Sequence, residues 1–246
     1  MRRTRQAGRT AASGYAYPRE ENGGGCMRDF TVALKKEWLY FAGSEKGVFL
    51  TYAMLVSAWS IMLATRSFVT DGASAGVWLL FFSVVVSAHF SNTVFISERL
   101  SGALEVVLCS GFSRGGLLGA KVFFCVAVSS ILGGGCIALS FLWRLLQGAS
   151  PGAFVGGADI CMFVAAVFFN VVLAAWLTIR LASPRLIHFA SIAALAFIWS
   201  VYYTLSAFVP LSLWHFTAAL TVIASGLYLL VKKEFHGEKI IAPLNV

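Results

Sequence analysis

The sequence contains little charge. Only 12% of its 246 residues are charged, whereas 59% are hydrophobic, and the mean hydropathy is +0.80. Soluble domains have about a quarter of their residues charged and about half apolar. An aqueous fold could not bury this much apolar surface, so the composition excludes a soluble protein and predicts a polytopic membrane protein. The net charge of +8 therefore bears on membrane orientation, and no nucleic-acid partner is expected.

The sequence also lacks the motifs of nucleotide hydrolysis and metal catalysis. No G-x-x-x-x-G-K-[ST] phosphate loop is present, since the nearest run, 116–121, reads GLLGAK and lacks the Gly-Lys-Ser/Thr ending. No H-E-x-x-H occurs, and no pair of carboxylates falls within one apolar run. These absences predict a chain that is not an enzyme and that binds no cofactor or metal itself.

The cysteines give no sign of a disulfide framework. Their number is odd, no C-x-x-C spacing occurs, and three of them lie in apolar runs, so we expect small apolar fillers. No secretory signal peptide is visible, because the first apolar run begins only near residue 48 and is too long for one. The five cysteines are Cys26, Cys109, Cys125, Cys136 and Cys161.

The apolar runs predict an all-α fold with six transmembrane helices in one domain, 48–231. Each run is long enough for about 30 Å of hydrocarbon, the first one barely. Pro151, Pro184 and Pro210 all fall between runs, which supports the boundaries. A cytoplasmic tail, 232–246, follows the last run. The predicted spans are 48–65, 76–97, 117–141, 154–179, 186–208 and 212–231.

Two segments precede the first span. Residues 1–26 are rich in arginine and glycine and lack apolar periodicity, which predicts a disordered basic tail. Translation starting naturally at Met27 and a genuine tail near anionic lipid headgroups both stay open. Residues 27–47 place Phe30, Leu34, Trp38 and Phe41 at helical spacing, which predicts an amphipathic helix in the membrane interface. A plain cytosolic lead-in is the alternative.

Basic residues set the expected orientation. Seventeen of the nineteen Lys and Arg residues fall in the N-terminal segment, the 98–121 connection, the 180–185 connection or the C-terminal tail. The connections on the other face hold only Arg66 and Arg144. The positive-inside rule therefore predicts that both termini and the 98–121 connection are cytoplasmic, in a multi-pass protein of the cell membrane, most simply a bacterial inner membrane.

Four polar residues within the spans are candidates for a transport path: His89, Asn92, Asp159 and Asn170. An ionisable group costs about 2.5–3.5 kcal/mol at the centre of a membrane helix and often marks such a path. The alternatives are that Asp159 lies at the interface and that His89 bonds a neighbouring helix. Three consecutive glycines, 133–135, predict either close helix packing or a bend in the third span.

The connection after the second span is helix-patterned. Within 98–108, ERLSGALEVVL, the residues Leu100, Ala103, Leu104, Val107 and Leu108 form one apolar face. The opposite face is polar, and Ser113 is placed to cap the third span. The pattern predicts a short helix along the membrane surface, either solvated or docking a cytosolic protein.

These residues carry a resemblance to a known family. The run 98–108, followed by Ser113-Arg114 and Gly119-Ala-Lys121, resembles the signature of type-2 ATP-binding-cassette (ABC) permeases, an E-x-x-x-G-T-L-E-x-L-L element followed by a P-x-S-R-like turn and a G-K pair. Ala103 stands for the usual Thr, Gly111-Phe112 replaces a frequent Pro, and Ala120 separates Gly119 from Lys121. Span number, chain length and the lead-in helix also match over about 27–231.

The resemblance implies a permease subunit of an ATP-powered exporter. The 98–108 helix would be the coupling helix on a cytosolic ABC ATPase, and 27–47 the connecting helix beside it. ATP and magnesium would be bound by the partner ATPase, and a second permease chain, identical or different, would complete the transporter within membrane lipid. The implied ATPase-coupling residues are Glu98, Arg99, Gly102, Glu105, Ser113 and Arg114, and those of the connecting helix are Lys35, Lys36, Glu37 and Trp38.

Other functions stay open from the residues alone. A haem-exporter-like permease has the same size and topology, and a machinery-associated membrane subunit could bind an ATPase without moving a solute. A membrane enzyme using His89 and Asp159 is a third alternative. The aromatic, apolar spans favour a lipophilic or amphipathic cargo, but lipid-facing residues give the same composition.

Overall fold

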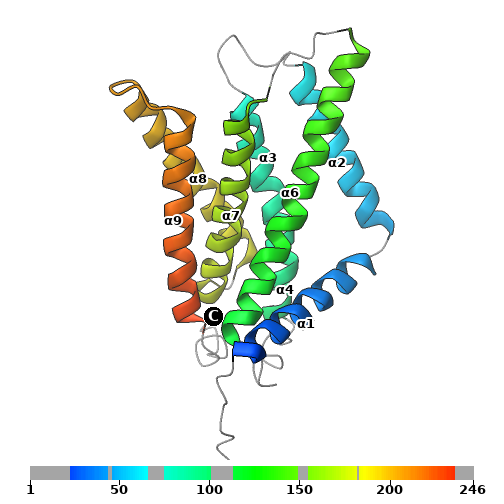
Figure 1. Ribbon diagram of the computed structural model, residues 1–246, viewed down its shortest axis with the longest axis vertical. Helices are drawn as coiled ribbons and strands as arrows, with labels where there is room; N and C mark the ends of the chain where they lie inside the picture. The colour runs from blue at the N-terminus through cyan, green and yellow to red at the C-terminus, as the bar shows by residue number, and fades with distance from the viewer. Residues whose placement is uncertain are drawn as a thin grey trace, which may run out of the picture.

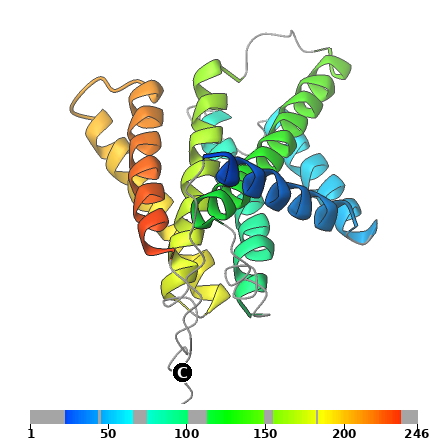
Figure 2. The same cartoon turned by 60° about the horizontal axis from the view of Figure 1, so that its bottom comes forward.

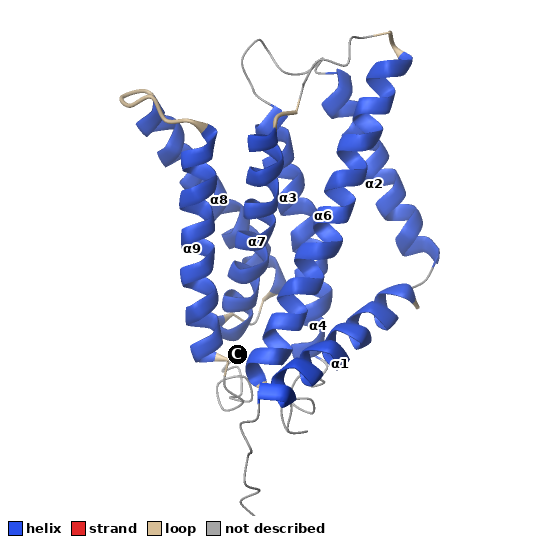
Figure 3. Cartoon of the chain, in the orientation of Figure 1, coloured by secondary structure: helices blue, strands red, loops and turns tan. Residues whose placement is uncertain are grey.

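The computed structural model describes residues 23–43, 46–65, 75–100, 113–148, 155–181 and 183–235, and within them every regular element is a helix (Figures 1 and 3). The all-α prediction is confirmed for these residues. Most of the basic N-terminal tail, the 101–112 connection and residues 236–246 lie outside them. The elements are α1 (Gly23–Ala42), α2 (Lys46–Thr65), α3 (Ala75–Ser91), the π-helix η1 (Asn92–Ile96), α4 (Ser97–Leu100), α6 (Arg114–Leu146), α7 (Gly157–Arg180), α8 (Pro184–Ser206) and α9 (Leu213–Glu234).

Most of the helices run side by side, and α1 lies obliquely across one end of them (Figures 1 and 2). The short helix α4, the start of α6 and the end of α9 are found at this same end, called the α1 end below (Figure 1). The first described helix and the end of the last one therefore lie at the same end of the bundle (Figure 1). The segments on either side of the 101–112 connection, α4 and the start of α6, therefore lie at the same end as α1.

Five helices are long and apolar enough to cross a membrane: 75–96, 114–146, 157–180, 185–206 and 213–234. The architecture is that of a multi-pass membrane protein. Helix α6 has 33 residues and a length of about 50 Å at 1.5 Å per residue, so it extends well past the predicted span 117–141. Within the described residues of α2, the apolar stretch Leu50–Thr65 is shorter than these five helices, and the sixth span stays a prediction.

Helix α7 lies between two hydrophobic cores. Its face bearing Phe163, Val167 and Val171 packs with buried residues of α2, α3 and α6. Its other face, bearing Met162 and Ala166, packs with buried residues of α3, α8 and α9. The spacing of each set is that of one helix face, so α7 is apolar around most of its circumference and is the most enclosed span.

Close packing explains the first of the three consecutive glycines. A Cβ atom at Gly133 would overlap the ring of Phe163 on α7, whereas nothing lies within 4 Å of such an atom at Gly134 or Gly135. Helix α6 continues through all three positions as one α-helix. The packing interpretation is thus confirmed at Gly133, because the missing side chain lets α6 and α7 approach each other.

Helix α1 is amphipathic, but its buried face differs from the predicted one. Phe30, Leu34 and Phe41 pack against the core, whereas Trp38 is 53% exposed. The side chain of Glu37 takes the inward position between Leu34 and Phe41 and is 4% exposed. The stripe that faces the bundle therefore has positions i, i+4, i+7 and i+11, and it carries a carboxylate into the interior.

Candidate functional site

Lys121 is the centre of a charged cluster at the α1 end. Its side chain is fully buried, and its Nζ lies 2.7 Å from Glu37 Oε1 on α1 and 2.5 Å from Glu98 Oε2 on α4. The same ammonium donates a hydrogen bond to the Val94 carbonyl at 3.2 Å. Its three protons thus have three acceptors, one each on α1, α4 and the π-helix, as a buried ammonium requires.

A second lysine closes the cluster on its solvent side. Lys36 Nζ lies 2.7 Å from Glu98 Oε1, and its side chain is partly exposed. Glu98 therefore joins a buried lysine of α6 to a surface lysine of α1. The two lysines and two carboxylates balance in charge, which makes burial of the cluster tolerable.

The π-helix explains how Glu98 reaches this position. A π-turn inserts one residue into a helix, and this rotates everything that follows by about 100° around the axis. The turn at Asn92–Ile96 comes directly before α4, and its Val94 carbonyl is the acceptor that Lys121 uses. Lys121 therefore binds both the irregular turn and the carboxylate whose direction that turn sets.

The surroundings of Glu98 favour its charged form. Burial raises the pKa of the carboxyl, but the ammonium groups of Lys121 and Lys36 outweigh this effect, and the pKa of Glu98 is lowered from 4.5. Glu98 is thus a carboxylate near neutral pH. Glu98 therefore pairs with both lysines in its charged form.

Two further contacts hold the ends of the 101–112 connection. Arg99 Nη1 donates to the Leu181 carbonyl at 3.1 Å, just past the end of α7, and burial lowers the pKa of this guanidinium. At the other end the backbone N–H of Ser113 donates to Asp29 Oδ2 on α1 at 2.8 Å. The segment that enters the connection and the one that leaves it are therefore attached to α7 and α1.

The remaining coupling and connecting-helix residues are Ser113, which is half-buried, three exposed residues, and two that lie outside the described residues. Ser113 is the N-cap residue of α6, as predicted, but its hydroxyl makes no capping hydrogen bond. The side chains of Arg114, Lys35 and Trp38 are exposed. Gly102 and Glu105 lie in the 101–112 connection, outside the residues that the structure describes, and their roles stay predictions.

The four candidate transport-path residues do not share one site. Asp159 accepts a hydrogen bond from the backbone N–H of Gly156 at 2.8 Å and so caps the start of α7, which fits the interface alternative. Asn170 is buried in α7, and its amide has no hydrogen-bond partner among the described residues. Asn92 is half-buried at the start of the π-helix.

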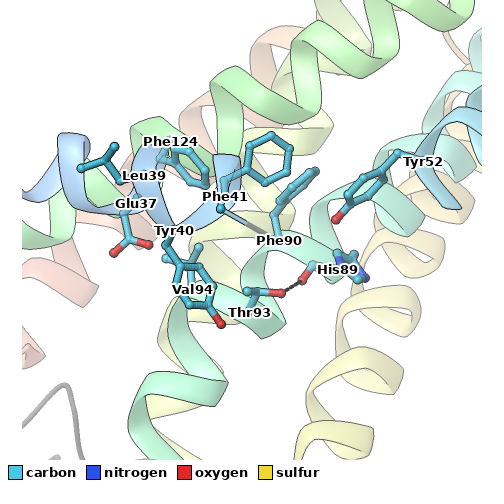
Figure 4. Close-up of a pocket in the computed structure, with 11 residues that line it drawn as sticks. Glu37, Leu39, Tyr40, Phe41, Tyr52, His89, Phe90, Thr93, Val94 and Phe124 are labelled. Atoms are coloured by element: carbon cyan, nitrogen blue, oxygen red, sulfur yellow. Dashed lines mark hydrogen bonds between the residues drawn. The ribbon is translucent and has the colours of Figure 1, made fainter. Parts of the chain in front are cut away.

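His89 lies at the α1 end, beside an aromatic pocket. Its ring is edge-on to that of Tyr52, with 5.2 Å between the centroids, and it is one of the residues that line the pocket (Figure 4). Its ring thus contacts the neighbouring helix α2, and the hydrogen bond to a neighbouring helix stays a prediction. The described residues hold no group of three or more His, Cys, Asp or Glu arranged for a metal ion.

From the sequence we did not predict the structural role of Lys121. We counted it with the charges of the connection, although it falls inside the predicted third span, 117–141. An ionisable residue inside a span is by itself a signal that a partner must exist. Glu37, one turn from Leu34 and from Phe41 on a helix with an apolar face, was the matching signal on α1.

Comparisons of the chain with protein-family models, with curated proteins and with solved structures found no match. The geometry of the α1 end therefore carries the functional argument.

Proposed function

We propose that this chain is the transmembrane permease subunit of an ABC transporter, an exporter in which a separate cytosolic ATPase supplies the energy. In this proposal six helices cross the membrane, α2 being the first, and the α1 end faces the cytoplasm. Helix α1 is the connecting helix, and the segment 98–108, which begins in α4, is the coupling helix. Two permease chains and two ATPases form the working assembly.

One observation carries the proposal: the buried cluster that joins α1, α4 and α6 through Lys121. A subunit that is moved by a soluble motor needs a rigid path from its docking segment to its spans. Here the segment that leads into 101–112 is tied by Glu98 to the third span and to α1, 2.5 Å and 2.7 Å away respectively. Force applied to the connection would move α6 and α1 together.

The contacts of Arg99 and Ser113 extend this path. They attach the two sides of the connection to the end of α7 and to α1. Because α7 lies between both hydrophobic cores, a displacement at its end reaches the packing of α3, α8 and α9 as well. The arrangement supports transmission to the whole bundle rather than to one span.

The test is a charge reversal that keeps the chain in the membrane. Glu98→Lys places a third cation against Lys121 and Lys36, which breaks the link between the connection and the spans. Glu234→Lys is the matched control, because Glu234 is a half-buried carboxylate at the same end, paired with Arg180 at 2.7 Å. Both variants reverse one charge on the same face.

Cys161 offers the readout, since it is a free, exposed cysteine near the start of α7, at the opposite end of the bundle. With the other cysteines changed to serine, its rate of labelling by a maleimide is measured in the purified complex with and without MgATP. We expect MgATP to change the rate in the wild type and in Glu234→Lys, and not in Glu98→Lys, while ATP hydrolysis continues in all three. A rate that responds to MgATP equally in Glu98→Lys contradicts the coupling path.

A further inference from the structure

A pocket of about 590 Å³ opens where α1 meets α2, α3 and α6 (Figure 4). This volume is in the range of sites that hold drug-sized molecules. Its floor is formed by buried side chains from five different elements, whereas Leu39, Tyr40 and His89 stand exposed at its rim. The buried residues of the floor are Glu37, Tyr52, Phe90, Val94 and Phe124.

The walls of the pocket are mainly aromatic. The rings of Tyr52 and Phe90 stack with their centroids 5.2 Å apart, and Phe41 meets Phe90 edge to face at 5.8 Å. Phe124 lies beyond Phe41, and Tyr40 is 66% exposed at the opening. Aromatic faces carry negative electrostatic potential and attract cations that come within about 6 Å of the ring centre.

The charges of the lining residues favour a cation, as the rings do. Among the described residues that line the pocket there is one carboxylate, Glu37, and no Lys or Arg. An organic anion would therefore meet ring faces and no accessible basic side chain, because Lys121, the partner of Glu37, is fully buried. A cation of the same shape would meet attractive groups on several sides.

The pocket also shares residues with the charged cluster. Glu37 and Val94 line it, and both are bonded to Lys121, Glu37 through Oε1 and Val94 through its carbonyl. A molecule in the pocket therefore touches the groups that hold α1 and the π-helix to α6. Occupancy of the pocket and the arrangement of the cluster are physically linked.

We propose that this pocket binds a lipophilic organic cation, an aromatic or aliphatic body that carries one delocalised or substituted positive charge. The body lies against Phe90, Phe124 and Tyr52, and the charge is held by the ring faces near Tyr40. All the described residues of the site come from this chain, so the proposal goes beyond the permease function and does not require an ATPase.

The test uses two probes of matched size and opposite charge, tetraphenylphosphonium and tetraphenylborate. Binding of each is measured separately to the full chain in lipid nanodiscs, and the signal of empty nanodiscs of the same lipid is subtracted. We expect saturable binding of tetraphenylphosphonium and none of tetraphenylborate. Equal binding of both ions, or a phosphonium signal no larger than that of empty nanodiscs, overturns the proposal.

Substitutions locate the site. Tyr40→Leu keeps an apolar side chain and removes an exposed ring, so the protein should fold normally and bind tetraphenylphosphonium about threefold to tenfold more weakly. Tyr203→Leu is the matched control, an exposed tyrosine near the far end of α8, 70% exposed and outside the pocket, and it should bind as the wild type does. Binding that is unchanged in Tyr40→Leu, or weakened as much in Tyr203→Leu, places the cation elsewhere and overturns the proposal.

Discussion

Two ion pairs at the α1 end have the same length and different surroundings. Lys121 and Glu37 are 2.7 Å apart and almost completely buried, whereas Arg180 and Glu234 are 2.7 Å apart with the arginine about half exposed. Water screens and competes for the second pair, and Arg180 also lies over the Trp176 ring at 4.6 Å. Water does not surround the first pair and so cannot take the place of a missing partner. Burial, and not distance, decides what each pair contributes.

The largest expected effect comes from removing the buried lysine. Lys121→Met leaves the buried Glu37 without a cation and Glu98 with only its surface partner Lys36, and we expect a loss of about 3–5 kcal/mol in the free energy of unfolding. The measurement is equilibrium unfolding of the purified chain in detergent. A loss below about 1 kcal/mol would show that the cluster does not hold these elements together.

A double substitution separates the lost charge from the lost volume. Glu37→Gln combined with Lys121→Met also removes the carboxylate that is left without a cation, while it keeps the shape of the site. We expect it to recover part of the stability that Lys121→Met loses, because replacing an ion pair costs far less than breaking it. A double variant less stable than Lys121→Met would locate the defect in packing.

We expect an intermediate effect on stability at Glu98, which has one buried and one surface partner. Glu98→Gln should lower the free energy of unfolding by about 1.5–3 kcal/mol near neutral pH, since it removes hydrogen bonds to charged donors. The pKa of this carboxyl is lowered in the folded chain, so its contribution is present above the ordinary value of 4.5 and is lost as the pH falls through the lower folded value. The wild type and Glu98→Gln should therefore converge in stability under acid. A gap that stays constant down to strongly acidic pH contradicts the ion pairs.

The smallest expected effect is at the exposed pair. Glu234→Gln should change the free energy of unfolding by no more than about 1 kcal/mol, and less at high salt. The same unfolding assay at low and high ionic strength checks this expectation. A loss as large as that of Lys121→Met would remove the distinction between the two pairs.

The sequence predicted the long helices well because their apolar runs are nearly uninterrupted. The predicted spans 154–179 and 212–231 lie close to α7 and α9, and the proline-bearing connection near Pro184 coincides with the start of α8. The bounds of these helices depend on hydrophobic composition and on local helix-breaking residues, and both can be read from a single sequence. Ser113 was likewise predicted to precede the third span, and it is the N-cap residue of α6.

The cluster was not predicted, because it depends on the register between distant elements. Glu37 and Lys121 are separated by 84 positions in the chain, and their pairing depends on which face α1 turns toward α6. The π-turn at 92–96 adds a rotation for which we know no local signal in one sequence. Glu98 and Lys36 were singled out as surface contacts, whereas the structure pairs them with each other.

The most direct test of the proposed function is the composition of the native assembly. The full chain would be purified from the membranes of its host in mild detergent, and the co-purifying proteins quantified by mass spectrometry together with MgATP hydrolysis. The account predicts an equal amount of a soluble ABC ATPase that carries its own phosphate loop, and hydrolysis that is lost when this subunit is removed. An intact assembly without such an ATPase, or hydrolysis by the isolated chain, would contradict it.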